Sequence, residues 1–258
     1  MVKTGNRFIE LLIELTMRDI KVRYKLSILG IYWAILNPLL LAGVWWFVFS
    51  NIFRAQGIEG VPYLLFLFAG ITFWNLFSNS LYSAVNSLTG NASLLTKTYF
   101  QRIVLPTSSV FARLVDFAFS FLVLLFLMLV YGISIHVEIL WIFPLLFFQL
   151  LFTLGMAYMV SSLNVLYRDT SQIINIILML WMYISPIFYT FEQIPDSIKA
   201  FYSFNPIGQL VHMGVRAVLN HEAPNGFYLL SSGISSVVVF LIGVIVFKHL
   251  EDLFAEVM

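Results

Sequence analysis

The residues of this chain best suited to chemistry are aromatic side chains set within long apolar stretches. Tryptophan and tyrosine combine an apolar ring face with a polar N–H or O–H group. Sugars stack their C–H faces on such rings, so an aromatic-lined tunnel would let a sugar polymer slide without tight binding. Aromatic residues in apolar stretches also form interface belts or face lipid, and the pattern leaves both interpretations open. The residues are Trp45, Trp46, Phe47, Phe49, Phe73, Trp74, Phe77, Tyr82, Trp181, Tyr183, Phe188 and Tyr189.

Other reactive groups are scarce in the sequence. It has no cysteine and no GxxxxGK[ST], HExxH, GxSxG or DxD motif, and the spacing of its four histidines matches no metal site. No carboxylate lies near the middle of an apolar stretch, where a proton-coupled carrier usually needs one. We therefore expect no catalytic residue, no metal and no cofactor on this chain. An enzyme and an ion-coupled carrier are disfavoured, and transport driven by another subunit remains.

The elements that must hold the aromatic residues are membrane-spanning helices. Of the 258 residues, 60% are hydrophobic and 10% charged, and the mean hydropathy is +0.93. A soluble fold of this length needs more polar surface, and the long apolar runs exclude an outer-membrane barrel. We predict an all-α membrane protein whose residues 30–258 form one domain with six transmembrane helices. The predicted spans are Ile31–Phe53, Tyr63–Ser83, Ala112–Ile133, Ile139–Asn164, Ile173–Phe191 and Tyr228–Phe247.

Lysine and arginine predict the orientation of these spans. Six of them precede the first span, and most others fall in the second-to-third and fourth-to-fifth links or after the last span. An even number of spans puts both termini on one side, and this bias places that side in the cytoplasm. The net charge of +1 gives no field that would indicate a nucleic-acid partner.

Residues 1–29 have the pattern of an amphipathic helix in the membrane interface. Polar side chains share one arc of the helical wheel and apolar side chains the next arc. The polar set is Arg7, Glu10, Glu14, Arg18, Lys21 and Lys25, and the apolar set is Phe8, Leu11, Leu12, Leu15, Val22 and Leu26. The pattern fits a topology anchor, a surface for anionic lipid or a docking surface for a cytoplasmic partner, and it does not decide among them.

Two polar links have patterns that fit moving parts. Residues 90–106 predict a short cytoplasmic helix that Pro106 stops before the third span; it is either a mechanical contact for a partner or an interfacial loop. Residues 193–219 predict two short outer helices, the second with Asn205 as N-cap and Pro206 at its first position. Neither is long enough to cross a bilayer, so they either dip into it at a pathway mouth or lie flat on its surface.

Charged residues near the spans predict local pairs. Arg113 and Asp116 lie three residues apart and are expected to form a structural ion pair. Arg23 lies one helical turn after Asp19 and could pair with it. Asp169 is expected to cap the helix of the fifth span.

Short motifs, taken in order along the chain, resemble the ABC-2 type permeases of polysaccharide exporters. Within that family the set resembles the permeases of O-antigen exporters most, with those for capsule and wall teichoic acid as relatives. The ordered set covers almost the whole chain, although each motif is short. The motifs are Lys21-Val-Arg-Tyr-Lys25, Asn37-Pro38, Phe68-Ala69-Gly70, Leu105-Pro106, Arg168-Asp169, Trp181-Met-Tyr-Ile-Ser-Pro186 and Asn205-Pro206.

The resemblance implies an ABC-2 transporter fold in a cell inner membrane and a homodimer of permease chains. It also implies two copies of a nucleotide-binding subunit, which would carry the ATP and Mg that this chain does not bind. The substrate would be a lipid-linked polysaccharide, on an undecaprenyl diphosphate anchor in the O-antigen case. The expected contacts with the ATPase subunit are Arg18, Lys21, Leu94, Lys97, Tyr99 and Arg102.

The resemblance further implies a channel and an exit gate. A channel lining projects onto Trp45, Trp46, Tyr183 and Tyr189. A lipid-headgroup site would use Arg23, Lys25 or Arg54, although topology anchoring accounts for these cations equally well. The outer gate would include Pro195, Asn205 and Pro206.

Other interpretations of the same residues stay open. An ABC-2 permease for drugs or small lipids would have the same architecture. A membrane-embedded enzyme acting on polyprenyl phosphates lacks the acidic or histidine cluster it would need. A non-catalytic scaffold leaves the broken outer segment without a purpose.

Overall fold

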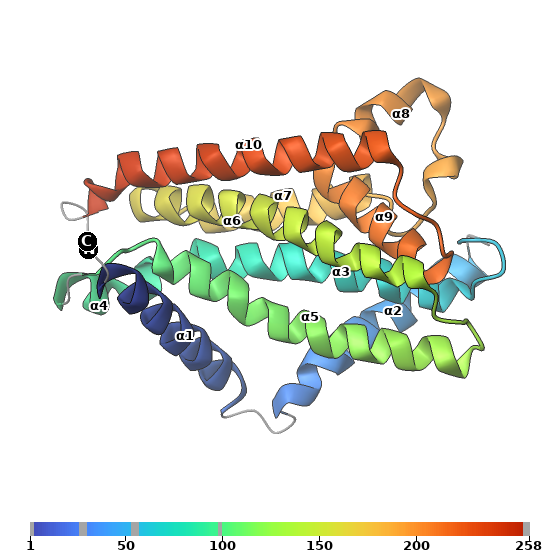
Figure 1. Ribbon diagram of the computed structural model, residues 1–258, viewed down its shortest axis with the longest axis horizontal. Helices are drawn as coiled ribbons and strands as arrows, with labels where there is room; N and C mark the ends of the chain where they lie inside the picture. Colours follow the sequence, from blue (N-terminus) through green and yellow to red (C-terminus); the bar gives the residue numbers. More distant parts are fainter. Residues whose placement is uncertain (1–2, 26–29, 53–56, 98–99, 255–258) are drawn as a thin grey trace.

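The computed structural model describes residues 3–25, 30–52, 57–97 and 100–254, and every regular element in these ranges is a helix (Figure 1). The start of α1, the helix α4 and the end of α10 lie at one end of the molecule, which we call the α4 end; α8 and α9 lie at the opposite, α8 end. The helices are α1 (Lys3–Tyr24), α2 (Trp33–Asn51), α3 (Tyr63–Val85), α4 (Ala92–Lys97), α5 (Val104–Val130), α6 (Ile142–Leu166), α7 (Thr170–Ile184), α8 (Asp196–Ser203), α9 (Pro206–Leu219) and α10 (Gly226–Glu251).

Among the described residues, five helices are long and apolar enough to cross a membrane: α2, α3, α5, α6 and α10. Each overlaps one of the six predicted spans, although the helix ends differ by several residues. The sixth corresponds to α7, which is apolar but has only 15 residues and therefore measures about 22 Å at 1.5 Å per residue. That is shorter than the roughly 30 Å of bilayer hydrocarbon.

The C-terminal end of α7 differs from the prediction. The predicted span runs on to Phe191, whereas α7 ends at Ile184 and Ser185 takes an extended backbone conformation with ψ 144°. The cause is Pro186, whose ring disfavours a helical conformation in the residue before it. At the other end of α7, Asp169 holds the N-cap position, as predicted, but its side chain makes no capping hydrogen bond.

The link before α5 also differs from the prediction. The short helix α4 ends at Lys97, and α5 begins at Val104, eight residues before the predicted third span. Pro106 therefore lies in the first turn of α5 and does not stop the preceding helix. A proline is tolerated there because the first N–H groups of a helix have no intrahelical partner.

The outer pair of helices begins and ends close to where the sequence predicts. Asn205 is the N-cap of α9, its side chain accepts a hydrogen bond from the Gly208 N–H at 3.1 Å, and Pro206 is at the first position. Most of α9 is buried against α3, α6 and α10, whereas the described residues of α8 are largely exposed. The second helix is therefore part of the core of the helix bundle.

The core centres on α3 and on the junction of α6 with α10. α3 is buried over most of its length. At the α6–α10 junction, a methyl group on Gly155 would lie 2.5 Å from the Val239 carbonyl oxygen, and one on Gly243 would meet the Gly155 carbonyl. We call this contact of Gly155 with Gly243 the glycine seam. Small residues allow backbones this close, which is how helices associate in membranes.

Candidate functional site

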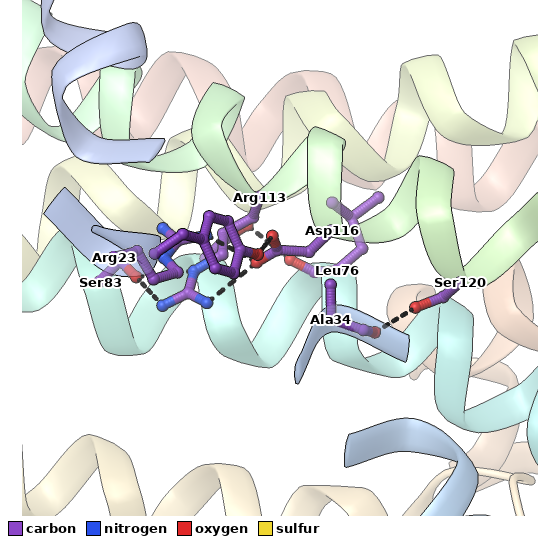
Figure 2. Close-up of polar contacts among 9 residues, drawn as sticks. Arg23, Ala34, Leu76, Ser83, Arg113, Asp116 and Ser120 are labelled. Carbon is purple, nitrogen blue, oxygen red and sulfur yellow. Dashed lines mark hydrogen bonds and ion pairs between the residues drawn. The ribbon is translucent and has the colours of Figure 1, made fainter. Parts of the chain in front are cut away.

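An ion-pair network joins α1 to α5 in the half of the bundle nearest α1 and α2. Arg23 of α1 donates to Asp116 Oδ2 at 2.6 Å, and Arg113 donates to the same oxygen at 3.1 Å (Figure 2). Tyr24 donates its hydroxyl to the other carboxylate oxygen of Asp116. The predicted Arg113–Asp116 pair is confirmed, but the pairing of Arg23 with Asp19 is wrong. Asp19 instead accepts from Arg18 at 2.8 Å.

The surroundings of this network alter the proton affinity of Tyr24. Burial, and then the hydrogen bond to Asp116 and the negative charge of that carboxylate, raise the pKa of Tyr24 to about 12. The tyrosine therefore stays neutral, keeps its proton and donates a hydrogen bond to Asp116. With two arginines around one aspartate, the network carries a net charge of +1.

The network borders a cavity of about 280 Å³, which we call the polar chamber. Residues from α1, α2, α3 and α5 line this cavity. Its wall is unusually polar for a site between membrane helices, where polar groups tend to mark a substrate or ion pathway. The lining residues are Arg23, Tyr24, Trp33, Ala34, Asn37, Pro38, Thr72, Asn75, Leu76, Asn79, Arg113, Asp116, Phe117 and Ser120.

One bond in the chamber wall compensates for a proline. Pro38 lies inside α2 and has no N–H to offer the Ala34 carbonyl one turn earlier. The Ser120 hydroxyl of α5 donates to that carbonyl at 3.0 Å (Figure 2). A span can carry a proline when a neighbouring hydroxyl supplies the missing donor in this way.

Helix α1 presents its polar arc outward and packs its apolar arc on the bundle. Leu15 is buried with Leu88, Leu105 and Phe247, and it confirms the predicted apolar face near the middle of the helix. Val22, predicted on that face, is 69% exposed. The ATPase candidates Arg18 and Lys21 lie on this helix, Lys21 exposed and Arg18 paired with Asp19.

The remaining predicted contacts with a partner subunit cluster at the α4 end. Leu94 and Lys97 lie on α4, and Tyr99 lies outside the described residues. Arg102 is turned toward its own chain: it donates to the Glu251 carbonyl at 2.6 Å and its guanidinium lies 5.9 Å from the Phe254 ring centroid. Arg102 thus ties the link before α5 to the end of α10.

Two of the four predicted channel residues, Trp45 and Tyr183, meet in one aromatic cluster between α2 and α7, and a third, Tyr189, is hydrogen-bonded beside it. The rings of Trp45 and Tyr183 lie edge to face at 6.1 Å, and Phe188 contacts both, at 5.1 Å and 5.5 Å. Tyr189 donates its hydroxyl to the Tyr183 carbonyl at 2.9 Å. Trp46, the fourth, follows Trp45 in the helix and is 39% exposed. The structure therefore brings Trp45, Tyr183 and Tyr189 together.

The predicted gate residues lie around the start of α9. Asn205 accepts from the Trp181 indole N–H at 2.9 Å and donates to the Ser185 hydroxyl at 3.0 Å, so it fixes α7 to α9. Pro195 is exposed just before α8. At the far end of α9, Arg216 bridges Glu192 and Glu222, each at 2.5 Å.

The charges around Arg216 shift the titration of Glu192. Burial acts to raise the pKa of Glu192, but hydrogen bonds and the Arg216 charge outweigh it and lower that pKa overall. The Glu192 carboxylate therefore stays ionised to a lower pH than a free glutamate would.

Of the predicted headgroup cations, the structure places one in the chamber. Arg23 lines it, Lys25 is exposed in the turn after α1, and Arg54 lies outside the described residues. Sequence reasoning missed the asparagines of the chamber wall. Asn75 and Asn79, one helical turn apart in an apolar span, were the available signal.

Comparison with known proteins identifies relatives along most of the chain. The family model described as ABC-2 type transporter matches residues 10–219. An O-antigen export system permease protein of Klebsiella pneumoniae is 32% identical over 96% of this chain and 95% of its own length. One of Myxococcus xanthus is 33% identical over 95% of this chain and 94% of its own. A more distant relative, the polysialic acid transport protein of Escherichia coli, is 23% identical over 98% of both.

Proposed function

The chain belongs to the ABC-2 type transporter family, and we propose that it is the membrane permease of an ATP-driven exporter for a lipid-linked polysaccharide. The cargo is an O-antigen chain on undecaprenyl diphosphate. The observation that carries this proposal is the full-length similarity to O-antigen export permeases from two different bacteria. The aromatic cluster of Trp45 and Tyr183 supports it, because such rings suit a sliding sugar polymer.

The proposed assembly contains two copies of this chain and two ATPase subunits, which hold ATP and Mg. It lies in the inner membrane with both termini in the cytoplasm. The distribution of lysine and arginine supports this orientation. The start of α1 and the end of α10 lie at the same end of the molecule, as this orientation requires (Figure 1).

ATP binding would act through α1 and the link that contains α4. The exposed Lys21, with Arg18, Leu94, Lys97, Tyr99 and Arg102, forms the proposed contact with the ATPase. A push on α1 would reach the membrane domain directly, since α1 packs on α5 and Arg23 is bound to Asp116. This gives the ion-pair network a mechanical part in the cycle.

The path of the polymer would follow the aromatic cluster, with Trp45, Trp46, Tyr183 and Tyr189 as its proposed lining. The exit gate would be the outer segment with Pro195, Asn205 and Pro206, in which Asn205 holds α9 and the described residues of α8 are largely exposed. Arg23 and Lys25 would bind the phosphate groups of the carrier lipid, and Arg54 is a further candidate. Arginine suits this task because its guanidinium binds phosphate oxygens in pairs.

The proposal is tested by supplying this chain and its genomic ATPase neighbour to cells that lack an O-antigen export permease. We expect the ATPase to co-purify with the chain and surface O-antigen to appear only when the ATPase has an intact Walker A lysine. Lys21→Glu should reduce both co-purification and export by about tenfold, through loss of charge complementarity. Glu59→Lys, an exposed charge reversal in the link between α2 and α3, is the matched control. Export without any ATPase would contradict the proposal.

A capsule exporter is the second candidate, because the polysialic acid transport protein matches the whole chain. The same experiment separates the two. Rescue of a capsule-export mutant, with no rescue of the O-antigen mutant, would favour this alternative.

A further inference from the structure

Two asparagines of the polar chamber interrupt the burial of α3. Over residues 65–81 of α3, every side chain is buried except those of Asn75 and Asn79. Both asparagines line the chamber, and Asn37 of α2 faces them from the wall formed by Trp33 and Pro38. Within residues 65–81, α3 is therefore accessible only where it lines the chamber, and the accessible side chains there are carboxamides.

These three carboxamides are not used by the fold. In the part of the chain that the structure describes, no hydrogen bond joins the side chain of Asn37, Asn75 or Asn79 to another residue. Other amides of the bundle are bound: Gln149 donates to the Phe73 carbonyl at 2.7 Å, and Asn205 bonds Trp181 and Ser185. Because all three side chains line the chamber and have no partner among the described residues, they are available to a ligand.

The side chains in the chamber wall indicate which chemical groups such a ligand would carry. A carboxamide both donates and accepts hydrogen bonds, which matches a hydroxyl group, whereas a phosphate oxygen only accepts. Trp33 and Phe117 add ring surface for the C–H face of a sugar. Arg23 and Arg113 give the same wall a net positive charge around Asp116. The wall therefore fits a sugar that carries an adjacent anionic group.

The volume limits how much of such a ligand enters. At about 280 Å³, the chamber lies just below the range of roughly 300–1,000 Å³ that is typical of small-molecule sites. That volume suits one sugar ring better than an oligosaccharide. The chamber thus suits the sugar that is joined to the diphosphate, with the rest of the polymer outside.

We propose that the polar chamber recognises the first sugar of the lipid-linked glycan, through hydrogen bonds from Asn37, Asn75 and Asn79 to its hydroxyl groups. Arg23 and Arg113 lie beside the attached phosphate. This inference rests on the proposed function and adds that the permease distinguishes a loaded carrier lipid from an empty one. Such selection would keep the exporter from binding the spent lipid left after the glycan has been removed.

The test measures binding of two defined lipids to the full chain in lipid nanodiscs. One probe is polyprenyl diphosphate, and the other is the same lipid carrying a single N-acetylhexosamine. We expect the chain to bind the sugar-bearing lipid about tenfold more tightly, as a few additional hydrogen bonds allow. In Asn75→Leu/Asn79→Leu that preference should vanish while the affinity for the bare diphosphate stays the same.

Two further variants distinguish a loss of sugar recognition from a loss of folding. Asn37→Leu changes an exposed residue at the chamber rim and should lower the preference about threefold on its own. Asn51→Leu, at the far end of α2 and outside the chamber, should keep it in full. Equal binding of both lipids by the unaltered chain, or a preference that survives loss of the asparagines, would overturn the inference and leave the proposed function standing. Binding of neither lipid would overturn both.

Discussion

The glycine seam and the polar chamber are two helix junctions of one bundle with opposite properties. At the seam, Gly155 and Gly243 bring α6 and α10 so close that neither position has room for a methyl group. At the chamber, four helices stand apart around a charged cavity. The seam is held by van der Waals contact between two backbones, whereas the chamber wall adds three charges and a few hydroxyl bonds to the apolar packing of its helices.

The difference shows which half of the molecule can change shape. Two backbones in contact have one good arrangement, so α6 and α10 should move as a unit. The chamber helices are joined in part by polar bonds, which a ligand or a partner subunit can replace. α2 illustrates this contrast: Leu40, Val44 and Phe47 are each 57–61% exposed, whereas α3 behind it is largely buried.

The largest effect should come from filling the glycine seam. Gly155→Ala places a methyl group 2.5 Å from the Val239 carbonyl oxygen, so α6 and α10 must separate. Overpacking of this kind costs about 1–3 kcal/mol or more, and we expect the upper part of that range because the obstacle is backbone. The measurement is thermal unfolding of the purified chain in detergent.

The matched control for the seam is Gly43→Ala in the middle of α2. A methyl group at Gly43 meets nothing within 4 Å, and alanine favours a helix by up to about 1 kcal/mol over glycine. The two substitutions should therefore change the melting temperature in opposite directions. An equal drop in melting temperature for both variants would show that the close approach of α6 and α10 does not limit the side chain at Gly155.

The next effect comes from removing the charge that holds the chamber together. Asp116→Asn leaves Arg23 and Arg113 facing each other without their shared carboxylate. The three side chains are 17–22% exposed, so solvent screens part of the repulsion, and we expect a loss of about 1–3 kcal/mol in unfolding free energy. In the matched substitution Asp196→Asn, the aspartate is 94% exposed and pairs only with Lys199 in the described structure, so unfolding should not change measurably.

The chamber should also be the alkali-sensitive junction. The folded pKa of Tyr24 is about 12 against an ordinary value of 10, so the fold favours the neutral phenol. The stability from this preference is full below pH 10 and is lost as the pH rises from 10 through 12. Tyr24→Phe has no proton to lose, so the difference in melting temperature between it and the unaltered chain should shrink across this interval. A constant difference would contradict the assignment.

What the sequence predicts well is whatever depends on neighbouring residues. Apolar runs locate the long helices, and Asn205-Pro206 marks the start of α9 because capping is a local event. The end of α7 was missed although Pro186 is visible, because hydropathy continues past a residue that only backbone geometry excludes from the helix.

The candidate site is harder to predict, since it is built from distant residues. Arg23 and Asp116 are 93 residues apart, and a local pattern favours Asp19 as the partner of Arg23. The sequence shows that Asn75 and Asn79 share a helix face, but only the packing of α2 and α5 shows that this face opens on a cavity. Side chains on one helix can be aligned from spacing, whereas the space between helices cannot.

The smallest expected effect comes from removing one hydroxyl group, and it can be compared between the chamber and the seam. Ser120→Ala removes the donor to the Ala34 carbonyl, which Pro38 leaves without a helical partner, and we expect a loss of about 1 kcal/mol in unfolding free energy. Tyr158→Phe is the comparison near the seam: its hydroxyl lies 3.0 Å from that of Thr107, which also donates to the Ile103 carbonyl.

Removing the Tyr158 hydroxyl leaves no backbone group without a partner, so its cost should be smaller than that of Ser120→Ala. Thermal unfolding of the two variants under one condition decides the order. If Tyr158→Phe proved the more destabilising, the hydroxyl of Ser120 would not be replacing the bond that Pro38 removes. The chamber wall would then depend on its charges alone, and Ser120 could be replaced without altering how α2 sits against α5.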